Sequence, residues 1–254
     1  MKKDIADQPR VPEGPQHKEV RKSMRKSKTP AKTGSAGWLV PAGLLLLSLI
    51  PVAAGAFRLT QLAGGADITP ANARFFASPV PVVLHILSVT IFSLLGAFQF
   101  SSAFRRRRPA WHRAAGRILI PSGLVAALSG LWMSHFYPWP DGDGLLLYGL
   151  RLLFGSVMLL SILLGIAAIR RREFVQHGHW MMRGYAVGLG AGTQVLTQLP
   201  WMLLIGKPDE LTRAMLMGAG WVVNLGVAEW IIRTATPRAR TASTIVSRLP
   251  SEQH

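Results

Sequence analysis

Six apolar stretches of about 20 residues alternate along the chain with polar and basic connections. They are Trp38–Phe57, Pro79–Ser101, Ala115–Phe136, Leu145–Ile169, Met181–Ile205 and Thr212–Ile232. A helix needs roughly 20 residues to cross about 30 Å of hydrocarbon. Backbone groups in lipid must be satisfied within the segment, so each stretch is expected to be a helix. The alternation typical of a membrane β-barrel is absent. The pattern therefore predicts an all-α polytopic membrane protein, a bundle of six transmembrane helices.

The two ends of the chain are polar. Residues 1–37 contain ten Lys and Arg, four Asp and Glu, and few large apolar side chains. Such a segment cannot bury enough surface to offset its ordering entropy, so we predict a disordered basic tail. Residues 235–254 are predicted to form a second, shorter disordered tail, which leaves 38–234 as the six-helix transmembrane domain.

The distribution of basic residues predicts the orientation of these helices. The chain has 29 Lys and Arg against 12 Asp and Glu, a formal net charge of +17. Of the basic residues, 24 lie in the N-terminal tail, in Arg105–Arg117, in Arg170–Arg183 and from Arg233 onward. The alternate connections hold only Arg58, Arg74, Lys207 and Arg213. Because cytoplasmic loops carry the excess of Lys and Arg, both termini are expected on the cytoplasmic side of the cell membrane.

The same distribution bears on binding partners. A large positive charge can indicate nucleic-acid binding, but here it borders the apolar stretches, where insertion bias and anionic headgroups explain it. We therefore expect the partners to be the lipid bilayer and anionic headgroups at the basic loops, and no nucleic acid. The chain has no cysteine, which excludes disulfides, thiolate metal sites and cysteine nucleophiles.

Polar and small residues form stripes on the expected helices. The second stretch carries its strongly polar side chains on one face, at His85, Ser88, Phe92, Gly96 and Gln99. Unsatisfied polar groups facing lipid are costly, so this face is expected to look inward. Glycines allow close approach of helices in lipid. Two glycine stripes are expected to face other helices: Gly184, Gly188 and Gly192, and Gly116, Gly123 and Gly130.

Histidines near both ends of the helices suggest one kind of chemistry. His85 and His135 are expected near the outer face, and His112 and His179 at the cytoplasmic face. Two imidazole pairs on different helices would suit two b-type haems in a transmembrane electron carrier. Against this, the fourth stretch has no histidine and the inner pair lies at the membrane interface. The alternative is that these histidines hydrogen-bond loop carbonyls or headgroups, or bind a metal or a quinone-like ligand.

Arginines and amides suggest a second kind of chemistry, the binding of an anion or a small molecule. The segments Arg105–Arg117 and Arg170–Arg183 both run from an arginine cluster through histidine to an arginine in the next helix, which resembles a duplicated hairpin. Repeated hairpins often place a site at their interface, as in a small-molecule transporter or sensor. Residues expected to line the bundle or contact an anion are Gln99, Arg113, Arg117, Arg183, Gln194, Asn224 and Glu229. Arg117 and Arg183 would clamp an anionic group or reach to headgroups, and Glu229 would pair with one of them.

No enzyme motif accompanies these residues. A Ser-His-Asp arrangement, a phosphate loop, paired intramembrane carboxylates and a metalloprotease motif are all missing. The sequence thus predicts a membrane protein of unspecified role, non-enzymatic or accessory, with the haem carrier and the transporter or sensor as alternatives.

Short motifs across residues 38–234 resemble the bacterial membrane-protein family called domain of unknown function 2306. They include Gly96-Ala-Phe-Gln-Phe100, Trp111-His-Arg-Ala-Ala-Gly-Arg117, His179-Trp-Met-Met-Arg183, Gly190-Ala-Gly-Thr-Gln194 and Trp221-Val-Val-Asn224. The resemblance implies a multi-helix membrane protein and no particular activity. It favours as site positions His85, Gln99, His112, Arg113, Arg117, His179, Arg183 and Glu229.

Overall fold

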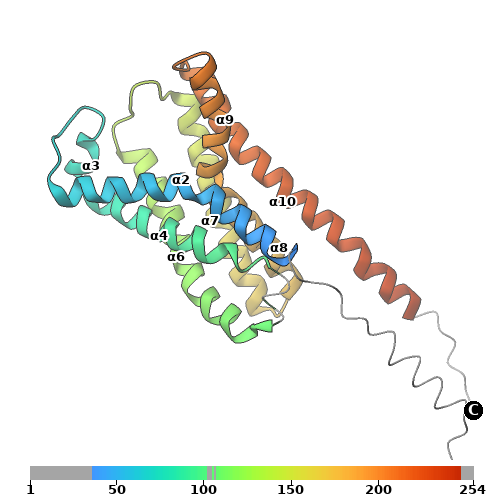
Figure 1. Cartoon of the computed structure of the whole chain (residues 1–254). Helices are drawn as coiled ribbons and strands as arrows, with labels where there is room; N and C mark the ends of the chain where they lie inside the picture. Colours follow the sequence, from blue (N-terminus) through green and yellow to red (C-terminus); the bar gives the residue numbers. More distant parts are fainter. Residues whose placement is uncertain (1–35, 102–104, 106, 247–254) are drawn as a thin grey trace, which may run out of the picture. The chain divides into compact units, whose positions relative to one another are not determined.

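The computed structural model describes residues 36–101, 105 and 107–246, with the backbone alone at 36, 37 and 235–246. The described residues form helices and no strands (Figure 1). In chain order the helices are α2 (Ala36–Gly64), α3 (Ala73–Ala77), α4 (Pro79–Ala97), α6 (Pro109–Phe136), α7 (Leu145–Arg170), α8 (Phe174–Gly188), α9 (Gly190–Leu204) and α10 (Glu210–Val246). The all-α prediction is confirmed.

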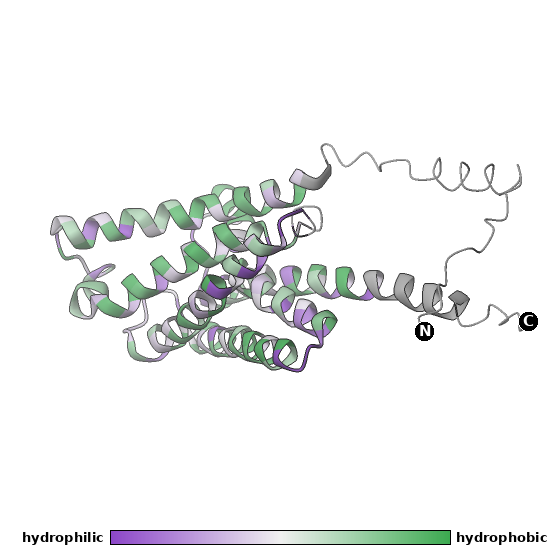
Figure 2. Ribbon diagram, turned by 90° about the horizontal axis from the view of Figure 1, so that it is seen from below, coloured by the Kyte–Doolittle hydropathy of each residue, from purple (hydrophilic) through white to green (hydrophobic). Residues whose placement is uncertain are grey.

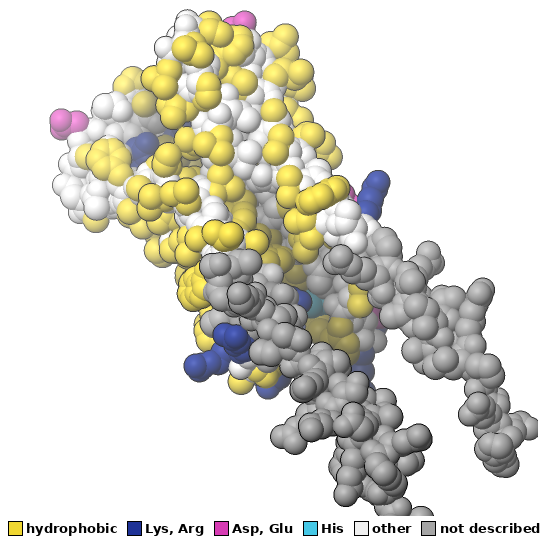
Figure 3. Space-filling model, turned by 45° about the vertical axis from the view of Figure 1, so that its right-hand side comes forward, with side chains coloured by type: hydrophobic (Ala, Val, Ile, Leu, Met, Phe, Trp, Pro, Cys, Tyr) yellow, Lys and Arg dark blue, Asp and Glu magenta, His cyan; other side chains and the backbone are white. Residues whose placement is uncertain are grey.

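Five of these helices are long and apolar enough to cross a membrane. The qualifying segments are Trp38–Gly64, Pro79–Ala97, Pro109–Phe136, Leu145–Arg170 and Glu210–Thr234. Hydrophobic residues follow them along most of their length (Figure 2). Many of their large apolar side chains point outward, such as Leu46, Leu153 and Val222, and hydrophobic side chains cover much of the face drawn in Figure 3. A surface of this kind suits hydrocarbon as the surrounding solvent.

The fifth apolar stretch differs from the prediction, because Met181–Ile205 is not one continuous helix. The helix is interrupted at Leu189, a turn residue whose backbone angles stay in the αR region and which separates α8 from α9, each of 15 residues. Glycine is unfavourable in a helix by about 1 kcal/mol relative to alanine, and Leu189 lies between Gly188 and Gly190. Both glycines also give space to rings, Gly188 to Phe92 and Gly190 to Trp221. Local propensity and ring packing thus favour a break at this point.

Asn224 on α10 bridges the break. Its Nδ2 donates to the Ala186 carbonyl at 3.0 Å, and its Oδ1 accepts from the Thr193 hydroxyl at 2.7 Å. Ala186 belongs to α8 and Thr193 to α9, so one amide holds both pieces. Backbone groups that a helix break frees within a membrane protein need other partners, and Asn224 supplies one of them, to the Ala186 carbonyl.

The core lies where α4, α6, α7 and α8 meet, around the buried rings of Phe92 and Tyr185. Tyr185 donates its hydroxyl to the Ser93 carbonyl at 2.7 Å and packs over Gly96. Gly123 and Gly184 lie against Ile162. The inward face predicted for α4 is therefore correct at its centre. The stripe on α6 is correct for Gly123 and Gly130 but not for Gly116, which has nothing within 4 Å of its Cβ position.

Contacts between the helices define two ends of the bundle. Phe98 packs on Trp111, and His177 bonds the Gly165 carbonyl, at the end that carries the exposed residues Arg107, Arg108, Arg170 and Arg171. We call this the basic end. Tyr137 bonds the Ser78 carbonyl at 2.5 Å, and Arg213 bonds Asp143, at the opposite end.

The predicted tails lie mainly outside the described residues. This applies to 1–35 and to 247–254. The backbone of α10 continues past Arg233 to Val246, so the first part of the predicted C-terminal tail is helical.

Candidate functional site

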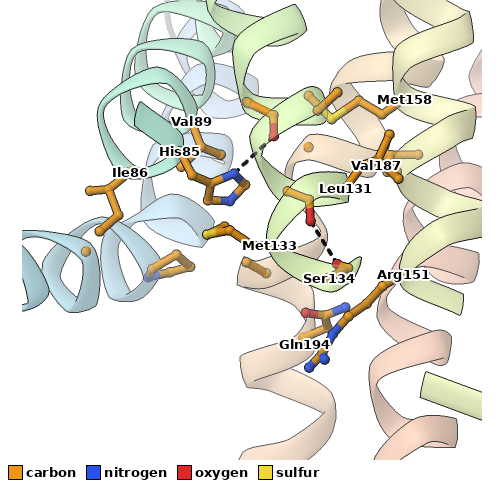
Figure 4. A pocket seen from close by; sticks show the side chains of 18 of the residues that line it. His85, Ile86, Val89, Leu131, Met133, Ser134, Arg151, Met158, Val187 and Gln194 are labelled. Carbon is orange, nitrogen blue, oxygen red and sulfur yellow. Dashed lines mark hydrogen bonds between the residues drawn. The ribbon is translucent and has the colours of Figure 1, made fainter. Parts of the chain in front are cut away.

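A cavity of about 480 Å³ lies among the helices. Its walls come from α2, α3, α4, α6, α7, α10, the connection 137–144 and the break between α8 and α9. It therefore lies between the hairpins α4–α6 and α7–α8 and extends from the helix break toward the end opposite the basic end. In Figure 4, His85 reaches toward it from α4, whereas Arg151 and Gln194 lie on the other side. This volume is in the range of small-molecule sites.

Charged side chains line one part of the cavity. The Asp143 carboxylate, 1% exposed, accepts from Arg151 Nη1 at 2.6 Å and from Arg213 Nε at 2.8 Å. Arg151 lies in the second turn of α7 and Arg213 in the first turn of α10, and Asp143 lies in the connection just before α7. Asp143 thus ties the two helix starts together through both of its oxygens.

A third arginine, Arg74 of α3, completes this charged part. Its Nη1 donates to the Pro138 carbonyl at 3.3 Å, and its guanidinium lies over the Phe75 ring, 4.7 Å from the centroid. Burial lowers the pKa of Arg74, and Asp143 opposes that shift. Among the described residues Arg74 makes no ion pair. We name Arg74, Arg151 and Arg213 the arginine cluster; with Asp143 its net charge is +2.

Tyr137 positions the connection that carries Asp143. Its ring is buried, stacks edge-on against Phe75 and Trp132, and donates its hydroxyl to the Ser78 carbonyl. Burial raises the pKa of Tyr137, so the phenol stays a neutral donor at physiological pH.

His85 is the one histidine on the cavity wall among the described residues. Its Nδ1 lies 3.0 Å from the Ala126 carbonyl oxygen and 3.2 Å from Ser129 Oγ, both on α6. A carbonyl only accepts, so Nδ1 carries the hydrogen and Nε2 of the neutral ring is an acceptor. Gln194, 6% exposed, lines the opposite wall and donates from Nε2 to the Met217 carbonyl at 3.1 Å.

Most of the remaining wall is apolar. It includes Ile86, Val89, Leu131, Met158 and Val187. The hydroxyls of Ser48, Ser93 and Ser134 also line the cavity, but each donates to a carbonyl of its own helix. The middle of the cavity therefore has few hydrogen-bond donors to offer.

The predicted residues of the basic end lie away from this cavity. Arg183 and Glu229 form a bidentate ion pair, with Nε–Oε1 at 2.5 Å and Nη2–Oε2 at 3.2 Å. Of the two arginines expected near Glu229, Arg183 is therefore the partner. Arg183 also lies over the Trp180 ring, whereas Arg113 and Arg117 are exposed.

Buried polar atoms near the basic end have no partner among the described residues. They are Gln99 Nε2 and His112 Nδ1. His112 interacts electrostatically with His177, and His179 interacts with Glu229. Because His177 and His179 are two residues apart on α8, they point to different sides of the helix. The histidine whose charge acts on His112 is therefore His177.

The outer pair expected for a haem is not brought together. His85 contacts α6 at Ala126 and Gly130. His135 lies about two and a half turns beyond Ala126 and so on the other side of α6. Its Nδ1 is 2.9 Å from the Tyr148 hydroxyl of α7. These two imidazoles do not fit opposite faces of one haem. The described residues also hold no group of three or more His, Asp or Glu arranged for a metal ion.

Sequence reasoning missed the arginine cluster. Of the cavity-lining residues with chemistry, the site residues predicted above include only His85 and Gln194, whereas Gln99 and Asn224 do not line the cavity. A signal was present in the charge count: Arg74 and Arg213 are two of only four basic residues expected on the outer side. That side normally avoids Lys and Arg, so a basic residue there requires another reason.

Comparison with known proteins gives a family and no activity. No curated protein and no solved structure matches the chain. A family model described as "Predicted membrane protein (DUF2306)" matches residues 82–232. The match runs from the first turn of α4 to the membrane segment of α10, and so includes His85, Asp143, Arg151, Gln194 and Arg213. The chain therefore belongs to the membrane-protein family DUF2306.

Proposed function

We propose that this protein binds a small molecule in the cavity between its two hairpins, as a transporter or sensor of the cytoplasmic membrane does. The observation that carries the proposal is the position of the cavity at the break between α8 and α9. Discontinuous helices at the interface of repeated hairpins are typical of substrate sites in membrane transporters. The mixture of an apolar wall with a few grouped polar side chains is typical of ligand pockets.

The proposed orientation places the arginine cluster on the outer side. We propose that α8 and α9 together make a sixth crossing, which puts both termini in the cytoplasm. Exposed arginines gather at the basic end, as expected for the cytoplasmic side. The cavity would then open outward, past Pro138 and Trp139, which line it.

Single introduced thiols test this orientation, because the chain has no cysteine of its own. Asp141→Cys places a thiol in the connection 137–144, and Glu173→Cys places one between α7 and α8; both positions are exposed. We expect a membrane-impermeant maleimide to label Asp141→Cys in spheroplasts, and to label Glu173→Cys only after permeabilisation. The reverse pattern would contradict the proposed orientation.

Filling the cavity tests binding. Val89 lines the cavity on α4, whereas Leu87, 50% exposed, lies on the outer surface of the same helix. The measurement is mass spectrometry of small molecules extracted from protein purified in lipid nanodiscs. We expect a molecule that copurifies with the wild type and with Leu87→Trp but is lost from Val89→Trp. If Val89→Trp folds and all three proteins carry the same small molecules, the cavity is not a binding site.

A further inference from the structure

The charges around the cavity are unbalanced. Asp143 is the sole acidic residue of the wall among the described residues, against the three cations of the arginine cluster. Other charged groups nearby do not line the cavity, among them the exposed Asp141 and Asp209. Arg58 interacts with Arg74, and the Glu210 carboxylate lies against Gly144 without an ion pair to any described residue. Among the side chains that line the cavity, the excess of positive charge is therefore +2.

The arginine cluster also has unused hydrogen-bond donors. A guanidinium has five N–H groups in a planar fork. Arg151 and Arg213 each give one to Asp143, and Arg74 gives one to the Pro138 carbonyl. Each Asp143 oxygen already accepts one bond and has room for about one more, so most of the remaining donors need acceptors from elsewhere. An oxyanion supplies acceptors and negative charge in the same group.

Beyond the arginine cluster the wall changes character. The side chains of Ile86, Val89, Leu131, Met158 and Val187 are apolar, and the serine hydroxyls between them already bond their own helices. A ligand that reaches from the arginine cluster to His85 therefore meets an apolar middle. A strongly hydrated inorganic ion would gain nothing there.

Resting on the binding cavity proposed above, we propose that the ligand is a small organic anion with an apolar body. Its carboxylate or sulfonate group binds to the arginine cluster beside Asp143, and its body packs against the apolar wall. A cation is disfavoured because no acidic side chain of the wall is left unpaired.

The rates at which a thiol in the cavity reacts with reagents of different charge test this inference without knowledge of the natural ligand. The ratio of these rates is called the charge preference below. Ser134 lines the cavity, and Ser134→Cys is nearly isosteric and introduces the sole thiol of the chain. The probes are three methanethiosulfonates, with a sulfonate, a methyl or a trimethylammonium group, applied to protein in phosphatidylcholine nanodiscs. Rates are divided by those of a free thiol. We expect the sulfonate reagent to react at least about tenfold faster than the trimethylammonium reagent.

Arginine variants assign the preference to the cluster. Arg74→Gln leaves both ion pairs of Asp143 intact and should reduce the preference by several-fold. Arg151→Gln should reduce it too, and if it fails to fold, Arg74→Gln alone carries the test. Arg117→Gln, at the exposed basic end, should leave the preference unchanged. Equal loss in Arg74→Gln and Arg117→Gln would overturn the assignment.

Competition tests the apolar body. 3-Phenylpropanoate should slow the neutral reagent, and its neutral amide and 3-phenylpropylamine should not. Slower reaction of the neutral reagent in nanodiscs that contain phosphatidylglycerol, without added 3-phenylpropanoate, would assign the anion to a lipid headgroup. If the neutral reagent reacts but the relative rates of the three reagents equal those with a free thiol, the inference of an anionic ligand fails while the cavity stands. If the neutral reagent does not react, the proposed binding cavity itself is wrong.

Discussion

Replacing Asp143 by alanine is expected to destabilise the folded protein by about 3 kcal/mol. Loss of one partner of a buried ion pair costs roughly 3–5 kcal/mol, because the remaining charge is left uncompensated. The lower end applies here, since the side chains of Arg151 and Arg213 are 25% and 31% exposed and solvent screens part of their charge. The carboxylate also joins the starts of α7 and α10, so its removal leaves three arginines facing one another.

Thermal unfolding in nanodiscs measures this effect, and Asp141→Ala is its matched control. Asp141 lies in the same connection but is exposed, so its replacement should change stability by less than about 0.5 kcal/mol. Adding 3-phenylpropanoate should recover part of the stability of Asp143→Ala, because the ligand anion would occupy the place of the lost carboxylate. Equal melting temperatures for the two variants would show that the Asp143 ion pairs contribute little.

The sequence predicted the membrane helices well because length and hydropathy alone determine them. Five apolar stretches correspond to the candidate membrane spans in α2, α4, α6, α7 and α10. The break at Leu189 was not predicted, because a run of glycines is compatible both with close helix packing and with a helix end. What separates the two outcomes is tertiary: the Phe92 and Trp221 rings at Gly188 and Gly190, and the Asn224 side chain across the break.

The candidate site was less predictable for a similar reason. The inward position of His85 follows from its stripe on α4, but the arginine cluster joins α3, α7 and α10, which are far apart in the chain. Arg151 and Asp143 are eight residues apart on either side of a helix start, and Arg213 comes from 70 residues away. Periodicity describes one helix at a time, so it does not show which loops meet at the end of a bundle.

The packing of α2 against α9 depends on a glycine, and its replacement should also have a large effect. A Cβ at Gly192 would lie within 3.0 Å of the carbonyl carbon of Leu47 and closer still to its oxygen. A neighbouring side chain can rotate away, but backbone moves only with its helix. Gly192→Ala should therefore push α2 from α9 and cost about 1–3 kcal/mol, the usual range for overpacking.

Gly226→Ala separates this steric effect from helix propensity. Gly226 is a helical glycine of α10 with nothing within 4 Å of its Cβ position. Alanine there should be neutral or stabilise by up to about 1 kcal/mol. Thermal unfolding in nanodiscs compares the two variants. Gly192 of α9 and Ser48 of α2 both line the cavity. Displacement of α2 should therefore also accelerate reaction of Ser134→Cys with the neutral methanethiosulfonate. A stable Gly192→Ala protein with unchanged labelling would show that α2 packs farther from α9 than the structure places it.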